Sequence, residues 1–241
     1  MESFIEIVQL LGFTEIGWGR VFLQATVVTL SLSVSGFFLG TIIGLTLTVA
    51  HFLGGPILRI FARSYGVIFR GIPDLFIIHL FYFGSSIWIT NMYHLVGGTG
   101  FVMVPSFVVG VLALGMISGA YQMEVYRGAY LSIHRGQIQA ALAYGMERNL
   151  IFKRIILPQG WRHAFPALGN LWQLILKDSS LISIIGVVEV MRQAHIAAGS
   201  THRSFLFYST AAAIHLVLTL VSSHIFRRLK RLSSAHRLGQ K

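Results

Sequence analysis

Residues 21–51 read VFLQATVVTLSLSVSGFFLGTIIGLTLTVAH and contain no acidic or basic side chain other than the terminal His51. A helix needs about 20 apolar residues to cross the hydrocarbon core of a bilayer, where it satisfies its backbone amides and carbonyls internally. This stretch is long enough, and the helix-breaking signal Gly54-Gly55-Pro56 follows it. Residues 21–51 therefore predict a transmembrane helix.

The composition of the whole chain agrees with a membrane location. Of the 241 residues, 54% are hydrophobic and 11% are charged, and the mean hydropathy is +0.70. An ordinary soluble domain carries about 25% charged residues. The formal net charge of +11 does not indicate nucleic-acid binding, because the basic residues flank apolar segments instead of forming one patch with stacking aromatics. The lack of cysteine excludes a disulfide framework, a thiolate metal site and a cysteine nucleophile.

Further apolar stretches predict four more spans. Residues 75–123 are long enough for two helices, with a turn at 91–100 that contains Gly97-Gly98-Thr99-Gly100. The remaining spans are expected at about 166–190 and 204–226. The chain is thus predicted to be an all-α integral membrane protein with about five transmembrane helices.

The distribution of basic residues orients these spans. Cytoplasmic loops are enriched in Lys and Arg. Such residues are dense after the first, third and fifth spans and sparse in the other loops. The N-terminus is therefore expected on the periplasmic side and the C-terminus in the cytoplasm. We expect a periplasmic segment at 1–20, retained because it lacks the features of a removable signal, a transmembrane domain at 21–226 and a basic cytoplasmic tail at 227–241.

The cytoplasmic segment 130–165 is too long for a tight connection and too charged for a span. It contains Gln139-Ala140-Ala141, then Gly145, and further on Ile155 and Leu157-Pro158. Small residues let another protein approach a short helix closely, and Pro158 is expected to end the next helix because proline lacks an amide donor. The pattern predicts a docking element. An amphipathic surface helix followed by a proline-terminated turn is the alternative.

At this point the chain resembles the permeases of importers in the ATP-binding-cassette (ABC) superfamily, whose "EAA" loop has the same spacing. The resemblance implies the type I ABC importer permease fold. It also implies that the loop docks on a cytoplasmic ABC ATPase dimer, which binds the ATP and magnesium, so that this chain has no cofactor of its own. The departure is Gln139, where the family usually has Glu; the amide lacks the charge but can keep a hydrogen bond. The matching positions are Ala140, Ala141, Gly145, Ile155, Leu157 and Pro158.

Other segments resemble polar amino-acid permeases over about residues 22–226. The stretch 169–201 is most similar to the Q-type subunit of histidine, lysine/arginine/ornithine and opine (octopine/nopaline) import systems. This resemblance implies import of a polar, basic amino acid or an opine across the bacterial inner membrane by alternating access. It also implies a periplasmic solute-binding protein and a second permease subunit in a heterodimer, although a homodimer stays open. The matching segments are 69–75 (FRGIPDL), Gly119-Ala120-Tyr121, Glu124, Arg127-Gly128-Ala129 and 176–183 (LKDSSLIS).

Asp178 is the first candidate for binding the solute. A charged side chain inside a membrane costs about 2.5–3.5 kcal/mol, so it is usually paired with an opposite charge or has a function in transport. Asp178 lies within the fourth expected span, beside Lys177 and before Ser179-Ser180. We predict that Asp178 holds a cationic group of the solute and that the two hydroxyls contribute hydrogen bonds. A local ion pair with Lys177 is the alternative.

Three other acids have simpler expected roles. Glu124 is a further solute candidate, but its spacing from Arg127 favours an ion pair. Asp74 is another, although its position at the start of a span favours helix capping. Glu189 is expected to pair with Arg192, one helical turn away.

No catalytic constellation is present in the sequence. A phosphate-binding loop ending in Gly-Lys-Ser/Thr is absent, the acids are dispersed, and the ten histidines show no metal-ligand spacing. We therefore predict neither an enzyme nor a metal site. Two rival functions are an ion-driven secondary transporter or channel, which would need coupling carboxylates in several spans, and a structural membrane anchor.

Overall fold

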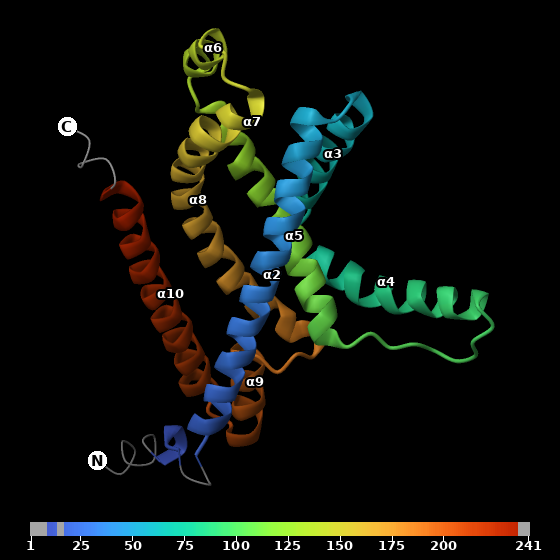
Figure 1. Ribbon diagram of the computed structural model, residues 1–241. Helices are drawn as coiled ribbons and strands as arrows, with labels where there is room; N and C mark the ends of the chain where they lie inside the picture. The colour runs from blue at the N-terminus through green and yellow to red at the C-terminus, as the bar shows by residue number, and fades with distance from the viewer. Residues whose placement is uncertain (1–8, 14–16, 236–241) are drawn as a thin grey trace. The chain divides into compact units, whose positions relative to one another are not determined.

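The computed structural model describes residues 9–13 and 17–235, and these residues form helices and connecting turns without a β-strand. Parts of the expected N-terminal segment 1–20 and of the tail 227–241 lie outside the described residues. The helices, drawn in Figure 1, are α2 (Gly19–Leu53), α3 (Pro56–Gly71), α4 (Asp74–Leu95), α5 (Ser106–Leu131), α6 (Arg135–Ala143), α7 (Arg148–Ile151), the π-helix η1 (Phe152–Ile156), α8 (Leu157–Asp178), the 3₁₀-helix η2 (Ser179–Ile185), α9 (Val190–Thr201) and α10 (Ser204–Ala235).

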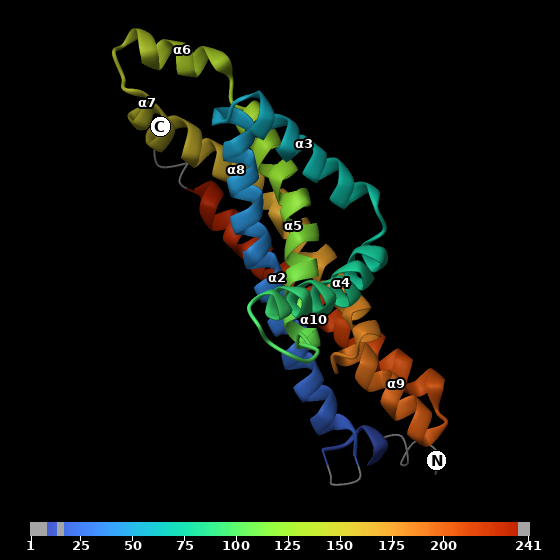
Figure 2. The same cartoon turned by 90° about the vertical axis from the view of Figure 1, so that its right-hand side faces the viewer.

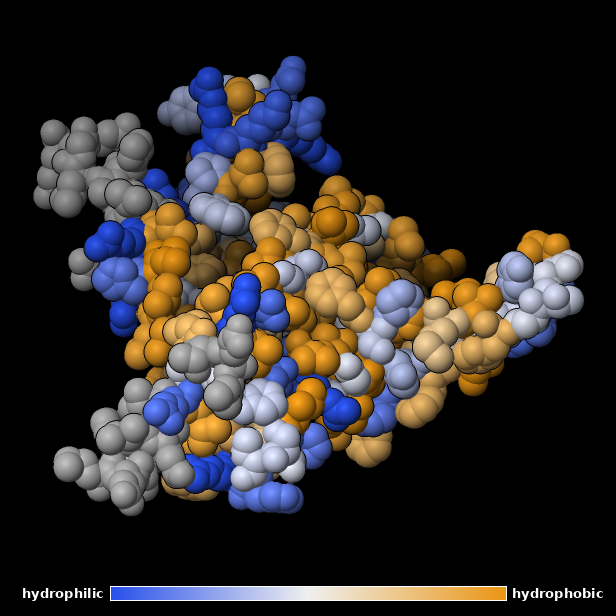
Figure 3. All heavy atoms as spheres, turned by 90° about the horizontal axis from the view of Figure 1, so that it is seen from below, coloured by the Kyte–Doolittle hydropathy of each residue, from blue (hydrophilic) through white to orange (hydrophobic). Residues whose placement is uncertain are grey.

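Four of these helices, α2, α4, α5 and α10, are long and apolar enough to cross a membrane. They coincide with four of the five predicted spans. Many of their large apolar side chains are exposed, and Figure 3 shows apolar side chains over much of the face that it presents. Such exposure suits helices that contact lipid or other membrane subunits. The prediction of an all-α membrane protein is confirmed.

The fourth predicted span, 166–190, is not one helix. Pro166 lies inside α8, and the helix ends at Asp178, where η2 begins. The hydroxyl of Ser179 donates to the carbonyl of Leu176 at 2.8 Å, a local bond that competes with continued α-helical pairing. Gly186, at a φ of +91°, then ends η2 in a conformation that favours glycine. The apolar run therefore contains a broken helix, which hydropathy alone does not reveal.

The described chain forms two compact units. Of the described residues, those within 1–36, 73–114 and 175–220 form unit 1, and those within 37–72, 115–174 and 221–235 form unit 2. The long helices α2, α5 and α10, together with α8, contribute residues to both.

Unit 1 has a core in which α9 packs against the first part of α2 and the start of α10 (Figure 1). The rings of Phe22 and Phe207 are stacked, with centroids 6.2 Å apart and an interplanar angle of 6°. Alanines supply most of the α9 side of this cluster. Their small side chains let the helices approach closely, which is a common way to pack helices in membranes.

Unit 2 is held together by a close approach of α2 and α5. A Cβ atom added at Gly40 would lie 2.6 Å from the Cβ of Ser118, and one added at Gly44 would lie 3.0 Å from the backbone nitrogen of Met123. Glycine is therefore required for the two backbones to come this near.

A buried glutamine adds polar contacts to the same helix pair. Gln122 on α5 is 0% exposed. Its Nε2 donates to the carbonyl of Phe37 at 3.0 Å and to the Ser118 hydroxyl at 2.9 Å. Its Oε1 accepts from the hydroxyls of Thr41 and Tyr126 at 2.9 and 2.8 Å. All four hydrogen-bonding positions of the amide are used, so this polar group is stably buried.

Candidate functional site

The predicted docking segment forms a short, well-terminated helix in unit 2. The Nδ1 atom of His134 accepts a hydrogen bond from the amide of Gly136 at 3.2 Å and caps the start of α6. In Figures 1 and 2, α6 lies beyond the ends of α5 and α8. The side chain of Gln159, near the start of α8, donates to Oε1 of Gln137 at 2.8 Å and so ties α6 to α8.

Gly145 ends α6 in a left-handed conformation. Its φ is +75°. The amide of Met146 donates to the carbonyl of Ala141 at 3.0 Å, and the amide of Gly145 donates to the carbonyl of Leu142 at 2.9 Å. These two bonds form a Schellman motif, in which glycine is favoured because a Cβ atom strains the left-handed residue. Gly145 therefore ends the helix, in addition to its predicted role of letting another protein approach closely.

The pair Ala140-Ala141 is divided between two faces of α6. Ala141 is 6% exposed and packs into the unit. Gln139, Ala140 and Ala143 are exposed on the helix. Tyr144, directly after α6, is 91% exposed. The side chains available to another protein are therefore those of Gln139 and two alanines, with the exposed Tyr144 directly after the helix.

Pro158 does not end a helix, contrary to the prediction. The segments α7, η1 and α8 follow each other without a break, and Pro158 is the second residue of α8. The amide of Leu157 donates to the carbonyl of Phe152, five residues earlier, as in a π-helix. A proline ring clashes with the carbonyl four residues before it, here that of Arg154, and a wide π turn is one way in which a helix can accommodate such a disturbance. Ile155 lies in this π turn, and Leu157 is exposed where α8 begins.

Two predicted solute residues, Asp178 and Asp74, come together in unit 1. Asp178 is the last residue of α8, and its Oδ2 atom is buried without a hydrogen-bond partner. Asp74 starts α4, and the carboxylates of the two residues are near enough to repel each other. The predicted capping by Asp74 is wrong, because Pro73 occupies the cap position and Asp74 makes no side-chain cap bond.

The two serines next to Asp178 use their hydroxyl protons locally. Ser179 donates to the carbonyl of Leu176 at 2.8 Å, and Ser180 donates to that of Lys177 at 2.7 Å. Their oxygens remain able to accept hydrogen bonds. No ion pair within 4.0 Å joins Lys177 to Asp178 in the described chain. Lys177 and Asp178 therefore attract each other only over a longer distance, without a direct ion pair.

Glu124 lies in unit 2 and makes the predicted ion pair with Arg127, at 2.6 Å between Oε2 and Nη2. Its other oxygen, Oε1, pairs with Nη2 of Arg70 at 3.1 Å. Both carboxylate oxygens are thus occupied by guanidinium groups, which leaves Glu124 poorly suited to bind a solute. The contact with Arg70 was not predicted, because it joins α3 to α5 across 54 residues of sequence.

Comparisons with known proteins agree with this architecture. Residues 36–233 match the model of the family described as binding-protein-dependent transport system inner membrane component. The chain belongs to this family. It is therefore an inner-membrane permease component of a transport system, as the spacing of residues 139–158 predicted.

This permease is similar to the octopine transport system permease protein OccQ of Rhizobium radiobacter, with 49% identity over 91% of this chain and 92% of the relative. It is 35% identical to the histidine/lysine/arginine/ornithine transport system permease protein HisQ of Escherichia coli, over 89% of this chain and 94% of that protein. A solved amino acid ABC transporter, crystallised with histidines, superposes with a TM-score of 0.77 and 30% identity, covering 89% of this chain and 94% of the other. The predicted type I permease fold and the Q-type resemblance are confirmed.

Glu189 of the permease has a role that sequence spacing missed. It is 0% exposed and forms the N-cap of α9. Its carboxylate accepts from the amides of Met191 and Arg192 at 2.9 and 2.8 Å, and the Thr29 hydroxyl accepts from the amide of Val190 at 3.2 Å. The predicted pairing with Arg192 is therefore to its backbone and not to its guanidinium. An acid directly before a new helix was the signal that could have indicated this cap.

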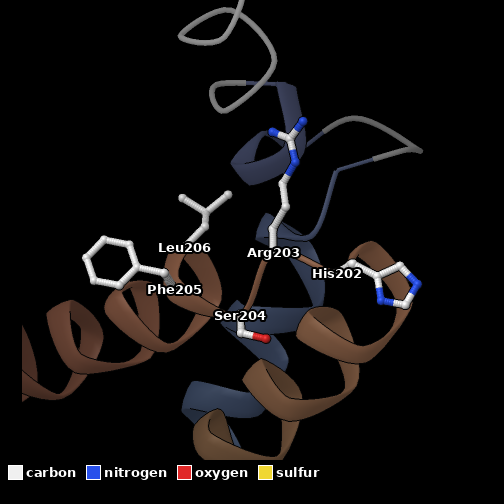
Figure 4. Close-up of a pocket in the computed structure, with 5 residues that line it drawn as sticks. All are labelled: His202, Arg203, Ser204, Phe205 and Leu206. Carbon is white, nitrogen blue, oxygen red and sulfur yellow. The ribbon is translucent and has the colours of Figure 1, made fainter.

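The permease also has an open hollow of about 490 Å³ at the turn between α9 and α10. Figure 4 shows the side chains of His202 and Arg203 pointing away from each other. All five lining residues, His202, Arg203, Ser204, Phe205 and Leu206, come from one continuous stretch. Polar groups do not converge on this hollow, and no group of three or more His, Asp or Glu residues that could hold a metal exists in the described ranges.

Proposed function

We propose that this permease forms half of the pathway through which an ABC importer carries a cationic amino acid or an opine into the cell. The proposal includes a cytoplasmic ATPase dimer that hydrolyses the ATP, a second permease subunit and a periplasmic solute-binding protein. The N-terminus would be periplasmic and the C-terminus cytoplasmic. The names of the relatives, which mention octopine, histidine, lysine, arginine and ornithine, support this class of solute.

The observation that carries the proposal is the continuity of α8. This one helix runs from Leu157, in the docking segment, to Asp178, and Pro166 lies inside it. Residues 139–158 would dock on the ATPase, and Asp178 would bind the cationic group of the solute. A displacement of the docking segment could then reach the solute residue through one helix, as alternating access requires.

The chemistry around Asp178 supports a cationic ligand. Its Oδ2 atom has no hydrogen-bond partner, Asp74 adds a second negative charge nearby, and the C-terminal end of α8 carries a partial negative charge. In contrast, Glu124 is paired with two arginines, and Glu189 is used as a cap. Asp178 and Asp74 are therefore the acids that we assign to the solute.

Uptake measurements with Asp178→Asn test the solute site. The variant keeps the size of the side chain but removes its charge, so uptake of basic amino acids should fall at least about tenfold while uptake of neutral amino acids falls less. Asp178→Glu, which keeps the negative charge at this position, is the matched control. An unchanged preference between basic and neutral solutes in Asp178→Asn would remove this residue from the binding role.

An ion-driven secondary transporter or channel is the second candidate function, and it would work without an ATPase. ATP-dependent uptake in proteoliposomes with the full complex distinguishes the two. Uptake that persists without ATP and follows an ion gradient would favour the rival. Thermal stabilisation of the purified complex by a panel of amino acids and opines would identify the solute.

A further inference from the structure

The docking segment carries an excess of positive charge that its own chain does not neutralise. Residues 134–158 contain four basic residues and the single acid Glu147, so the formal net charge is +3. The side chains of all five are exposed. Among residues 9–13 and 17–235, no ion pair within 4.0 Å joins any of these cations to an acid, whereas Glu124 pairs with Arg70 and Arg127. The four cations are Arg135, Arg148, Lys153 and Arg154.

Apolar side chains are exposed among these cations. Tyr144 stands at the end of α6 and is the most exposed of the group. An exposed tyrosine surrounded by polar residues is typical of an anchor that fills a pocket on a partner. The other large apolar residues exposed in the segment are Leu142, Leu150, Phe152 and Leu157. The docking segment thus combines an exposed aromatic side chain and other exposed apolar groups with an excess of exposed cations.

The charge pattern also explains why an amide is suitable at position 139. Gln139 lies on the exposed face of α6, beside Ala140 and Ala143. Because the two alanines are small, they do not shield the Gln139 side chain, which could contact a partner surface directly. A glutamate here would suit a basic partner, whereas a neutral amide avoids repulsion from an acidic one.

We propose that the surface which receives α6 on the ATPase is an apolar groove with an acidic rim, and that Gln139 is selected because a carboxylate would be repelled there. This inference rests on the proposed docking function. It concerns the chemistry of the partner, because the four cations find their counter-charges on the ATPase. An anionic membrane surface suits α6, which carries Arg135, less well, since this helix lies beyond the ends of α5 and α8 (Figure 2). The other three cations lie on α7 and η1, directly before α8.

The test measures binding of the separately produced ATPase subunit of the same transport system to the permease in phosphatidylcholine nanodiscs. The dissociation constant of the wild type should increase several-fold as NaCl is raised from about 50 to about 300 mM, because salt screens opposite charges. Gln139→Glu should weaken binding about fivefold to tenfold at low salt and show a smaller salt effect. Gln139→Ala, which loses the amide without gaining a charge, is the matched control and should bind more tightly than Gln139→Glu.

Tighter binding by Gln139→Glu, or binding of the wild type that does not depend on salt, would overturn the acidic rim. A salt effect that appears only when phosphatidylglycerol is added to the nanodiscs would assign the cations to the lipid and also overturn it. Tyr144→Ala separates this inference from the docking proposal. If Tyr144→Ala and both Gln139 variants all bind like the wild type, the docking function itself fails; if Tyr144→Ala alone weakens binding, only the charge inference fails.

Discussion

Replacing Gly145 by alanine is expected to weaken association with the ATPase, although alanine is small. The φ of Gly145 is +75°, and a Cβ atom placed there meets no other atom within 4 Å. The penalty is therefore conformational and not steric, and it amounts to about 1–2 kcal/mol for a non-glycine residue in the left-handed region. If α6 docks only with its Schellman motif formed, this free energy corresponds to a loss of affinity of roughly 5-fold to 30-fold.

The order of two variants at Gly145 distinguishes conformation from bulk. Asparagine is larger than alanine but tolerates the left-handed region better. Binding of the ATPase to nanodisc-embedded permease, followed by biolayer interferometry, should therefore rank glycine first, asparagine second and alanine third. If the ATPase instead excludes bulky side chains at position 145, asparagine should bind more weakly than alanine. Weaker binding by Gly145→Asn than by Gly145→Ala would refute the conformational reasoning.

Two further predictions concern stability, measured as the unfolding midpoint of the detergent-solubilised protein. Gly44→Ala should destabilise unit 2 by about 1–3 kcal/mol, because the new Cβ atom would lie 2.9 Å from the Cβ of Gln122. The control Gly84→Ala adds a Cβ atom in open space on α4 and should instead stabilise the protein by about 0.5–1 kcal/mol. Equal shifts of the unfolding midpoint in the two variants would contradict the close approach of α2 and α5. Glu189→Ala should cost about 1–3 kcal/mol because two amides of α9 lose their acceptor. Glu189→Gln should recover only part of this loss, because the two amides bond to different oxygens and glutamine keeps one of them; an unchanged midpoint in Glu189→Ala would contradict the role of the cap.

The spans that could be predicted are those whose signal is local. Apolar runs of sufficient length indicated α2, α4, α5 and α10, because hydropathy is a property of each segment alone. The segment 166–190 is also rich in apolar residues, but it contains Lys177, Asp178 and Glu189, and its helix ends at Asp178. That break depends on serine hydroxyls that bond to backbone carbonyls and on the left-handed Gly186, which hydropathy does not register.

In the candidate site, too, the contacts within one helix could be predicted from the sequence, and those between helices could not. The pair Glu124–Arg127 was predictable from its spacing on one helix, whereas the contact of Glu124 with Arg70 depends on how α3 packs against α5. The proximity of Asp74 to Asp178 joins residues that are distant in sequence, and spacing gave no sign of it. The error at Pro158 arose because the disturbance that this residue causes is absorbed by the preceding π turn, an irregularity that residue propensities do not indicate.

The π turn and the Gln137–Gln159 hydrogen bond together connect the two proposed sites. The π turn, Phe152–Ile156, is an irregular point directly before α8, and Pro166 is a second one inside α8. The hydrogen bond of 2.8 Å bypasses the first point, because Gln137 belongs to α6 and Gln159 lies beyond the π turn. A displacement of α6 would therefore be passed to α8 through this hydrogen bond as well as through the π turn. Since α8 ends at Asp178, this helix would link the proposed docking and solute sites, and Pro166 is the interior position where it lacks an amide donor.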